Sequence, residues 1–189
     1  MLRSSPDRFG AVAVTIHWST AILIVALLGS GFRAAHALDP VTKVAILRFH
    51  IPAALAVVST TLARVVWWIA FDRKPLAPRS SSVWERRAAR LVHLSLYLAI
   101  LVMASSSIAM LVASGAGTAL LSSSGGTLPR FTDYASRSVH GIVAEVLILL
   151  LVAHIGAALN HHFVRRDRLI RRMWFGSCQF RRMERQTRW

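Results

Sequence analysis

The chain has 189 residues, of which 54% are hydrophobic, yet it carries a formal charge of +15 at neutral pH. A soluble domain of this length spreads its charges over every exposed helix face, whereas here long intervals carry almost none. The basic residues lie at the ends of the apolar intervals, where they fit topology signals and anionic lipid headgroups better than nucleic acid. We therefore predict an integral membrane protein that binds no nucleic acid.

Four stretches of the chain are long and apolar enough to cross a bilayer as helices, which requires about 20 residues. The first stretch is longer than the apolar part of a cleaved signal peptide and contains His17, so we expect it to remain in the mature protein. The predicted membrane helices cover residues 11–37, 44–71, 89–114 and 139–163.

The connections between these stretches favour a simple topology. The first is short, the second (residues 72–88) is rich in Pro and Arg, and the third (115–137) contains a flexible Ser/Gly segment at 122–126. Helices joined in this way pack as an antiparallel up-down-up-down bundle. We therefore predict an all-α fold with one domain, residues 1–189, that ends in a basic tail at 164–189.

The distribution of Lys and Arg predicts the orientation of this bundle. Seventeen of these residues lie in the N-terminal segment, around the middle connection and in the tail, whereas five lie on the opposite side. Short loops rich in Lys and Arg stay in the cytoplasm, so we predict that both termini and the middle connection are cytoplasmic. Four tryptophans fall near that predicted boundary, as amphipathic rings should: Trp18, Trp67, Trp68 and Trp84.

Two histidines stand fourteen residues apart on the fourth stretch, where Glu145 is the only formal charge between residues 139 and 159. Fourteen residues turn through about 1400°, some 40° short of four full turns, over a rise of about 21 Å. His140 and His154 therefore leave the same face of one helix, near opposite edges of a hydrocarbon layer about 30 Å thick. This geometry suits two stacked prosthetic groups.

In the predicted topology the histidines fall into sets by depth. Two lie towards the outer side and can share one metal: His50 and His140. Three compete for two positions towards the inner side: His17, His93 and His154. The other three fall at membrane boundaries, where an imidazole meets water or lipid phosphate: His36, His161 and His162.

Paired imidazoles at two depths fit haem iron better than zinc. Two imidazoles that face each other across a bundle suit the axial positions of a haem, whereas zinc favours tetrahedral sets enriched in Cys, His and carboxylate. The single cysteine, Cys178, excludes the CxxCH motif that attaches haem covalently. We therefore predict two non-covalent haem b groups. The competing hypothesis is a haem-free protein whose histidines form hydrogen bonds between helices.

Two charged residues inside the stretches, Arg64 and Glu145, have competing interpretations. Arg64 follows His50 by fourteen residues, which puts it on the same helix face at the depth of the inner haem. We predict that it contacts a haem propionate or a quinone oxygen; the alternative is that it extends to the inner interface. Glu145 lies about 140° around the helix from His140, and its two interpretations are a proton path and a neutral acid bonded to a neighbouring helix.

These residues resemble the bacterial cytochrome b561 family, the four-helix di-haem membrane cytochromes related to the b-type subunits of nickel–iron hydrogenases. The resemblance extends from Phe9 to about Met173. Ala54 departs from it, because a glycine is common in the family after the second-helix ligand. The most specific parts are residues 9–18 ending in Ile-His-Trp, 47–68 with His50 and Arg64, 93–97 and 140–173.

The resemblance implies the haem ligands and the cellular location. It implies that His17 and His154 ligate the inner haem and that His50 and His140 ligate the outer one. It also implies the bacterial inner membrane, with quinone as a substrate. The short free-standing type in this family oxidises superoxide and reduces ubiquinone. The residues that line a quinone site by this resemblance are His93 and either His161 or His162.

A haem iron with two histidine ligands has no open position for oxygen, so we predict one-electron transfer by a relay of two haems about 20 Å apart. The leading hypothesis is an electron carrier between a periplasmic donor and ubiquinone, with superoxide:ubiquinone oxidoreductase activity if superoxide is the donor. A soluble redox protein is the other donor considered. Five predicted outer cations would attract superoxide: Arg33, Lys43, Arg48, Arg130 and Arg137.

The alternative hypothesis is an anchor subunit that forwards the electrons of a separate dehydrogenase or hydrogenase. Such a subunit is expected to carry an extended loop or tail for docking, whereas this chain is short with compact loops. We therefore favour a free-standing protein. The candidate partners are membrane lipid, quinone, a periplasmic redox protein and a second copy of the chain in a homodimer.

Overall fold

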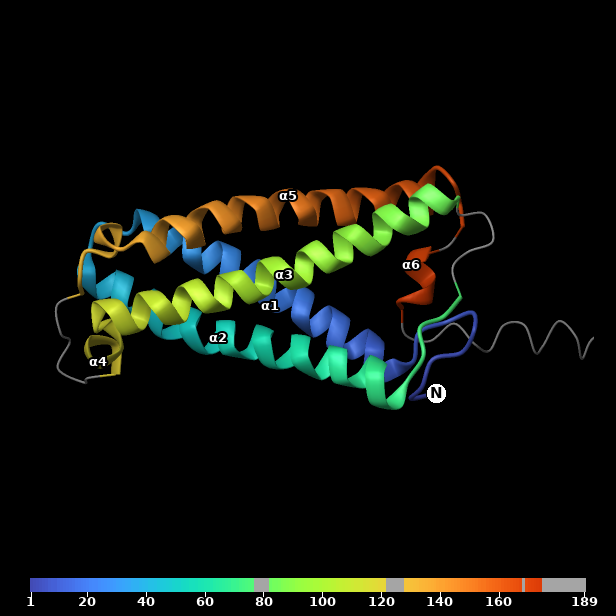
Figure 1. Cartoon of the computed structure of the whole chain (residues 1–189), viewed down its shortest axis with the longest axis horizontal. Helices are drawn as coiled ribbons and strands as arrows, with labels where there is room; N and C mark the ends of the chain where they lie inside the picture. The colour runs from blue at the N-terminus through green and yellow to red at the C-terminus, as the bar shows by residue number, and fades with distance from the viewer. Residues whose placement is uncertain (77–81, 122–127, 168, 175–189) are drawn as a thin grey trace, which may run out of the picture.

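The structure is a computed structural model that describes residues 1–76, 82–121, 128–167 and 169–174. Four long helices dominate it: α1 (Ala11–His36), α2 (Pro40–Val66, continued by a π-helical turn, Trp67–Phe71), α3 (Val83–Ser114) and α5 (Ala135–Phe163) (Figure 1). Each is long and apolar enough to cross a membrane. The predicted all-α fold with four membrane helices is therefore confirmed.

Three of these helices, α2, α3 and α5, begin earlier than the sequence predicted. In α2 and α3, caps rather than hydropathy define the first turn. The Asp39 carboxylate accepts hydrogen bonds from the backbone of Val41 and Thr42, and Pro40 occupies the first turn of α2. At the start of α3, Ser82 and Glu85 form a reciprocal capping box. The starts at residues 44, 89 and 139 were therefore four to six residues late.

Short elements that were not predicted lie between and after the long helices. α3 ends where Gly115 adopts a left-handed conformation with φ of 64°, which a residue without a Cβ takes at little cost. α4 (Ala116–Leu121) follows at once, a 3-10 turn (Phe131–Asp133) precedes α5, and α6 (Leu169–Arg172) comes after it. The Ser/Gly segment at 122–126 and the tail from residue 175, including Cys178, lie outside the described residues.

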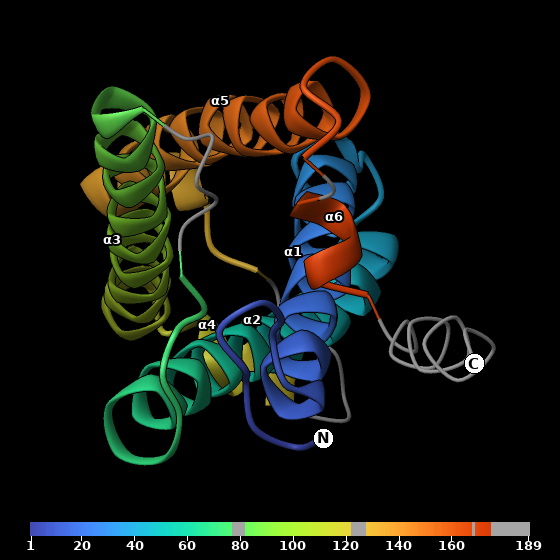
Figure 2. The same ribbon diagram turned by 90° about the vertical axis from the view of Figure 1, so that its right-hand side faces the viewer.

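The four long helices surround a common axis. α1 packs along α2, and α3 packs along α5. Figure 2 looks along the bundle and shows the order α1, α2, α3, α5 around it. The N-terminal segment, the end of α2 and α6 lie at one end, which we call the N-terminal end, and α4 lies at the other (Figure 1).

The side chains agree with a membrane environment. Many large apolar residues point outward; Ile22 is 67% exposed and Leu149 is 68% exposed. Such a surface suits lipid rather than water. Each long helix contributes one buried residue to a central apolar layer, which consists of Ile24, Val57, Ala99 and Leu147.

Hydrogen bonds close the N-terminal end. The Asp72 carboxylate accepts bonds from the backbone N–H and the hydroxyl of Ser4, at 3.0 and 2.7 Å, and from the Trp67 indole N–H. The Arg172 guanidinium donates to the backbone carbonyls of Pro6 and Leu76. These contacts join the N-terminal segment to the end of α2 and to α6.

Candidate functional site

Polar side chains gather at two levels, one on each side of the central apolar layer. On α5, Leu147 lies seven residues from both His140 and His154, and α2 repeats this spacing around Val57. Seven residues make nearly two helical turns, so each helix presents a polar group, an apolar group and a polar group along one face. The bundle therefore contains two separated polar levels.

We name the two levels by their residues. The serine–histidine level is nearer α4 and consists of Ser30, His50, Ser106, Ser107 and His140. The arginine–histidine level is nearer the N-terminal end and consists of His17, Arg64, His93 and His154.

At the serine–histidine level, hydroxyl groups hold both imidazoles. The Ser30 Oγ lies 2.9 Å from the Nδ1 of His50. The Ser106 and Ser107 Oγ atoms lie 3.1 and 3.2 Å from the Nδ1 of His140. The imidazoles of His140 and His50 also lie close enough for their charges to interact. This level thus joins α1 to α2 and α3 to α5 through their polar groups.

These serines were not predicted as site residues. Only their depth pointed to them, since each lies on its own helix at the depth of the histidine that it contacts on the neighbouring helix. Hydroxyls are common in membrane helices, where they usually bond to their own backbone. Whether a serine faces a partner depends on the rotation of its helix, which the sequence does not state.

At the arginine–histidine level, His154 lies between two other imidazoles. Its ring centre is 6.3 Å from that of His17 and 5.1 Å from that of His93. The Nη1 of Arg64 lies 3.2 Å from the Nδ1 of His17, while its buried Nε has no hydrogen-bond partner among the described residues. The Nδ1 of His93 donates to the Ala89 carbonyl at 2.6 Å. All three predicted inner candidates therefore meet at one level, together with Arg64.

The remaining predicted residues lie apart from both levels. Glu145 is exposed on α5. The His36 ring bonds to the carbonyl of Phe32 at the end of α1. Beyond the arginine–histidine level, His161 pairs with Asp167, and the Nδ1 of His162 is buried without a partner in the part of the chain that the structure describes.

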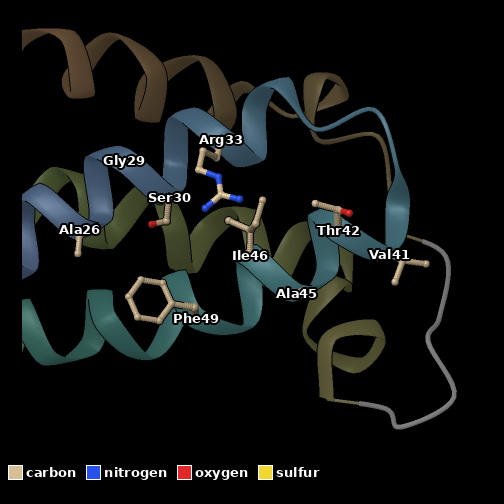
Figure 3. A pocket seen from close by; sticks show the side chains of 9 residues that line it. All are labelled: Ala26, Gly29, Ser30, Arg33, Val41, Thr42, Ala45, Ile46 and Phe49. Carbon is tan, nitrogen blue, oxygen red and sulfur yellow. The ribbon is translucent and has the colours of Figure 1, made fainter.

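A groove of about 650 Å³ lies between α1 and α2 near the serine–histidine level (Figure 3). The side chains of Arg33, Ile46 and Phe49 line it, and so does Ser30, which holds His50. The guanidinium of Arg33 points into the space between the two helices (Figure 3). A small molecule in the groove would therefore lie close to the serine–histidine level.

Comparison with known proteins decides the family. The sequence model of the prokaryotic cytochrome b561 family matches residues 8–176. The chain belongs to this family. Cytochrome b561 homolog 1 of Escherichia coli K12 is 24% identical over 174 residues, covering 88% of this chain and 97% of the relative. Cytochrome b561 homolog 2 of the same organism is 27% identical over 183 residues, covering 90% and 93%.

As a member of the cytochrome b561 family, the protein is a membrane b-type cytochrome that transfers electrons. The donor sets fit such a haem. The imidazoles lie in pairs at the two levels, His17 with His154 and His50 with His140. Among the residues that the structure describes, no group of three or more His, Cys, Asp and Glu side chains could hold a metal ion. Metal–imidazole bonds of about 2 Å on both sides of an ion put two ring centres roughly 6 Å apart. His17 and His154, at 6.3 Å, match this separation.

One further observation agrees with a haem at the arginine–histidine level, and Gly31 shapes the serine–histidine level. The unpartnered buried Nε of Arg64 is a donor without an acceptor, as expected where an anionic group such as a propionate binds. Next to His50, a Cβ added at Gly31 would lie 3.2 Å from the ring carbon Cε1. The backbone of α1 therefore approaches this imidazole closely.

Proposed function

We propose that the protein holds two b-type haems, one between His50 and His140 and one between His17 and His154, and carries electrons across the membrane. The observation that supports this most is the pair of imidazole levels on either side of the central apolar layer. On α5 the two ligands are separated by a rise of about 21 Å, so each level serves one side of the membrane.

Bound haem supplies one-electron redox chemistry, and two histidine ligands leave its iron no open position for oxygen. The chain contributes the ligands, their orientation and an apolar surrounding. The central layer of Ile24, Val57, Ala99 and Leu147 keeps the two levels separate. The chain would therefore hold the two haems at fixed and separate sites, where each would supply one-electron transfer.

We infer that His17 rather than His93 is the partner of His154. The separation of 6.3 Å between the His17 and His154 ring centres suits a metal bonded to both rings, whereas 5.1 Å between His93 and His154 is shorter than two such bonds require. His93 would then border the haem and contact a propionate or a quinone. The same role applies to Arg64, whose Nε has no partner.

We propose that the quinone pool accepts the electrons at the arginine–histidine level and that the donor acts from the periplasm. His93 and either His161 or His162 would line the quinone site, since His162 keeps a buried Nδ1 without a partner. The donor would approach the end with α4, where five cations lie near the helix ends: Arg33, Lys43, Arg48, Arg130 and Arg137. Their charge would attract superoxide or an acidic redox protein.

Optical spectra and haem content test the ligand assignment. The purified protein should contain two reducible b-type haems per chain. His50→Ala and His154→Ala should each remove one of them, because an iron that loses one axial imidazole is held less tightly. His36→Ala, at the end of α1, is the matched control and should keep both. Absence of a b-type spectrum, or two haems in both ligand variants, would contradict the proposal.

Anaerobic mixing tests the direction of electron flow. Superoxide should reduce the haems, and a water-soluble ubiquinone analogue should reoxidise them, while the oxidation state is followed optically. If neither reagent changes the oxidation state of a protein that holds haem, the superoxide:ubiquinone activity is wrong. The role of anchor for a separate dehydrogenase would then be favoured.

A further inference from the structure

We propose that Ser30, Ser106 and Ser107 are positioning residues that hold His50 and His140 in the tautomer with a proton on Nδ1 and a free lone pair on Nε2. The inference deepens the proposed function, because it concerns how the serine–histidine level receives a haem. It gives three hydroxyls a defined role and concerns residues that the ligand assignment does not include.

Each of these serine hydroxyls also lies within hydrogen-bond distance of a backbone carbonyl on its own helix. The Ser30 Oγ donates to the carbonyl of Leu27 at 3.1 Å. The Ser106 and Ser107 Oγ atoms both donate to the carbonyl of Met103, at 3.0 and 2.8 Å. A hydroxyl has a single proton and a carbonyl can only accept, so both contacts are hydrogen bonds at once only if the serine donates to the carbonyl and accepts from the imidazole. Each serine therefore accepts a hydrogen bond from the histidine.

The direction of these bonds selects the tautomer. The ring atoms that face the hydroxyls are the Nδ1 of His50 and the Nδ1 of His140, at 2.9 Å from Ser30 and 3.1 Å from Ser106. An Nδ1 that donates a hydrogen bond must carry the proton of the neutral ring. The Nε2 atom then keeps a free lone pair that can bind a metal. Metal-binding histidines are commonly fixed in this way by an acceptor beyond the ligand itself.

Packing fixes the orientation of the same rings. Ser106 is buried, with 6% of its surface exposed. The backbone of α1 approaches His50 so closely that a Cβ at Gly31 would lie 3.2 Å from its Cε1. The His50 ring therefore contacts the hydroxyl of Ser30 at Nδ1, and a side chain at position 31 would crowd the ring at Cε1.

The arginine–histidine level lacks this arrangement. The Nδ1 of His17 faces the Nη1 of Arg64, and a guanidinium only donates, so Nδ1 must accept and the proton of the neutral ring lies on Nε2. His17 must release Arg64 before its Nε2 can bind a metal. The two levels therefore differ in the tautomer of their histidines in the absence of haem: Nε2 is free to bind a metal in His50 and His140, whereas it carries the proton in His17.

The first experiment compares haem retention in the full-length purified protein. In the double variant Ser106→Ala/Ser107→Ala, we expect haem to be bound about 10- to 100-fold more weakly at one of the two sites. The reduction potential of that haem should rise, because an imidazole without an acceptor at Nδ1 donates less electron density to ferric iron. The second haem should keep its affinity and potential.

Matched variants separate positioning from packing. Ser105→Ala removes the neighbouring hydroxyl, which is exposed and donates to the carbonyl of Leu101 on its own helix, and should change neither haem. Ser106→Ala/Ser107→Thr keeps one hydroxyl and should restore retention and potential. Ser30→Ala should weaken the same haem through His50, whereas Ser59→Ala, which removes an exposed hydroxyl of α2, should not.

The second experiment needs no haem. In the full-length haem-free protein, ¹⁵N NMR of the imidazoles should find His50 and His140 protonated on Nδ1. Ser106→Ala/Ser107→Ala should move His140 towards a mixture of tautomers and leave His50 unchanged. A wild-type chain that binds no haem contradicts the proposed function alone, since the tautomers can still be measured. Two haems with unaltered retention and unaltered tautomers in the double variant would overturn the role of the serines.

Discussion

Arg64 is a cation within a membrane-spanning segment, where its charge should affect the reduction potential of a nearby redox group. One nitrogen contacts the Nδ1 of His17 and the Nε has no partner. A charge kept at this depth is expensive unless it meets an anion or a polar ligand. Its side chain therefore influences any redox group bound between His17 and His154.

Removing this charge should lower one reduction potential. A nearby cation favours the reduced form of a haem, so Arg64→Leu should make reduction at the arginine–histidine level less favourable. A charge-assisted hydrogen bond contributes about 1.5–3 kcal/mol, which corresponds to a fall of about 60–130 mV for one electron. A redox titration measures this shift. Arg64→Lys keeps the charge and should shift the potential less; equal shifts of both haems would contradict the assignment.

At this scale the sequence predicted which residues meet, and it could not predict how they meet. Helical spacing and depth brought His17, His93 and His154 to one level, as the structure has them. The contact of Ser30 with His50 was missed, because it depends on the rotation of α1 against α2. The ligand pairing itself stays a prediction that haem-loss variants test.

Among the helices, α5 presents contrasting leucines two residues apart. Leu147 is 5% exposed in the central apolar layer, whereas Leu149 is 68% exposed on the outer surface. Leu147→Ala should lower the free energy of unfolding by about 2–4 kcal/mol, because it leaves a cavity between four helices. Leu149→Ala should change it little. Unfolding in mixed detergent measures both, and equal losses would show that this layer is not the core.

The N-terminal segment and the end of α2 are joined through Asp72. Partial burial raises the pKa of this carboxyl, but hydrogen bonds from Ser4, Arg73 and Trp67 outweigh it and hold the pKa below its ordinary value of 3.8. An acid with a lowered pKa stabilises the fold above its unfolded pKa, and this contribution is lost as the pH falls through the folded pKa.

Protection of the N-terminal segment against hydrogen exchange should therefore depend on pH. The backbone N–H of Ser4, which donates to Asp72, should keep its protection at neutral pH and lose it when the pH falls below about 3.8. In Asp72→Asn the protection should be weaker at neutral pH and should no longer change in this range. A variant with the acid dependence of the wild type would rule out this carboxyl as the cause.

Hydropathy alone does not predict where the helices begin. Residues 40–43 and 83–88 contain charged or polar side chains, so an apolar criterion began α2 and α3 too late. The capping signals were present in the sequence, with Asp39 before Pro40 and Ser82 three residues before Glu85. The π-helical turn at Trp67–Phe71 has no comparable signal, because it depends on how α2 ends against its neighbours.

For the whole molecule, orientation in the membrane remains a prediction from the charge distribution. Two exposed positions at opposite ends of the bundle can test it in a Cys178→Ser background: Thr118 on α4 and Arg73 after α2. A membrane-impermeant maleimide added to intact spheroplasts should label Thr118→Cys and not Arg73→Cys. Labelling of Arg73→Cys alone would invert the topology and would make the α4 end cytoplasmic.

The central apolar layer has a consequence for energetics. Ile24, Val57, Ala99 and Leu147 offer no side-chain donor or acceptor, so a proton finds no relay through them, while an electron needs none. Charge movement between the two levels would then be uncompensated and electrogenic. Moving one elementary charge against the full membrane voltage costs about 2.3 kcal/mol per 100 mV. The membrane potential would therefore oppose this electron transfer and slow the turnover of the protein.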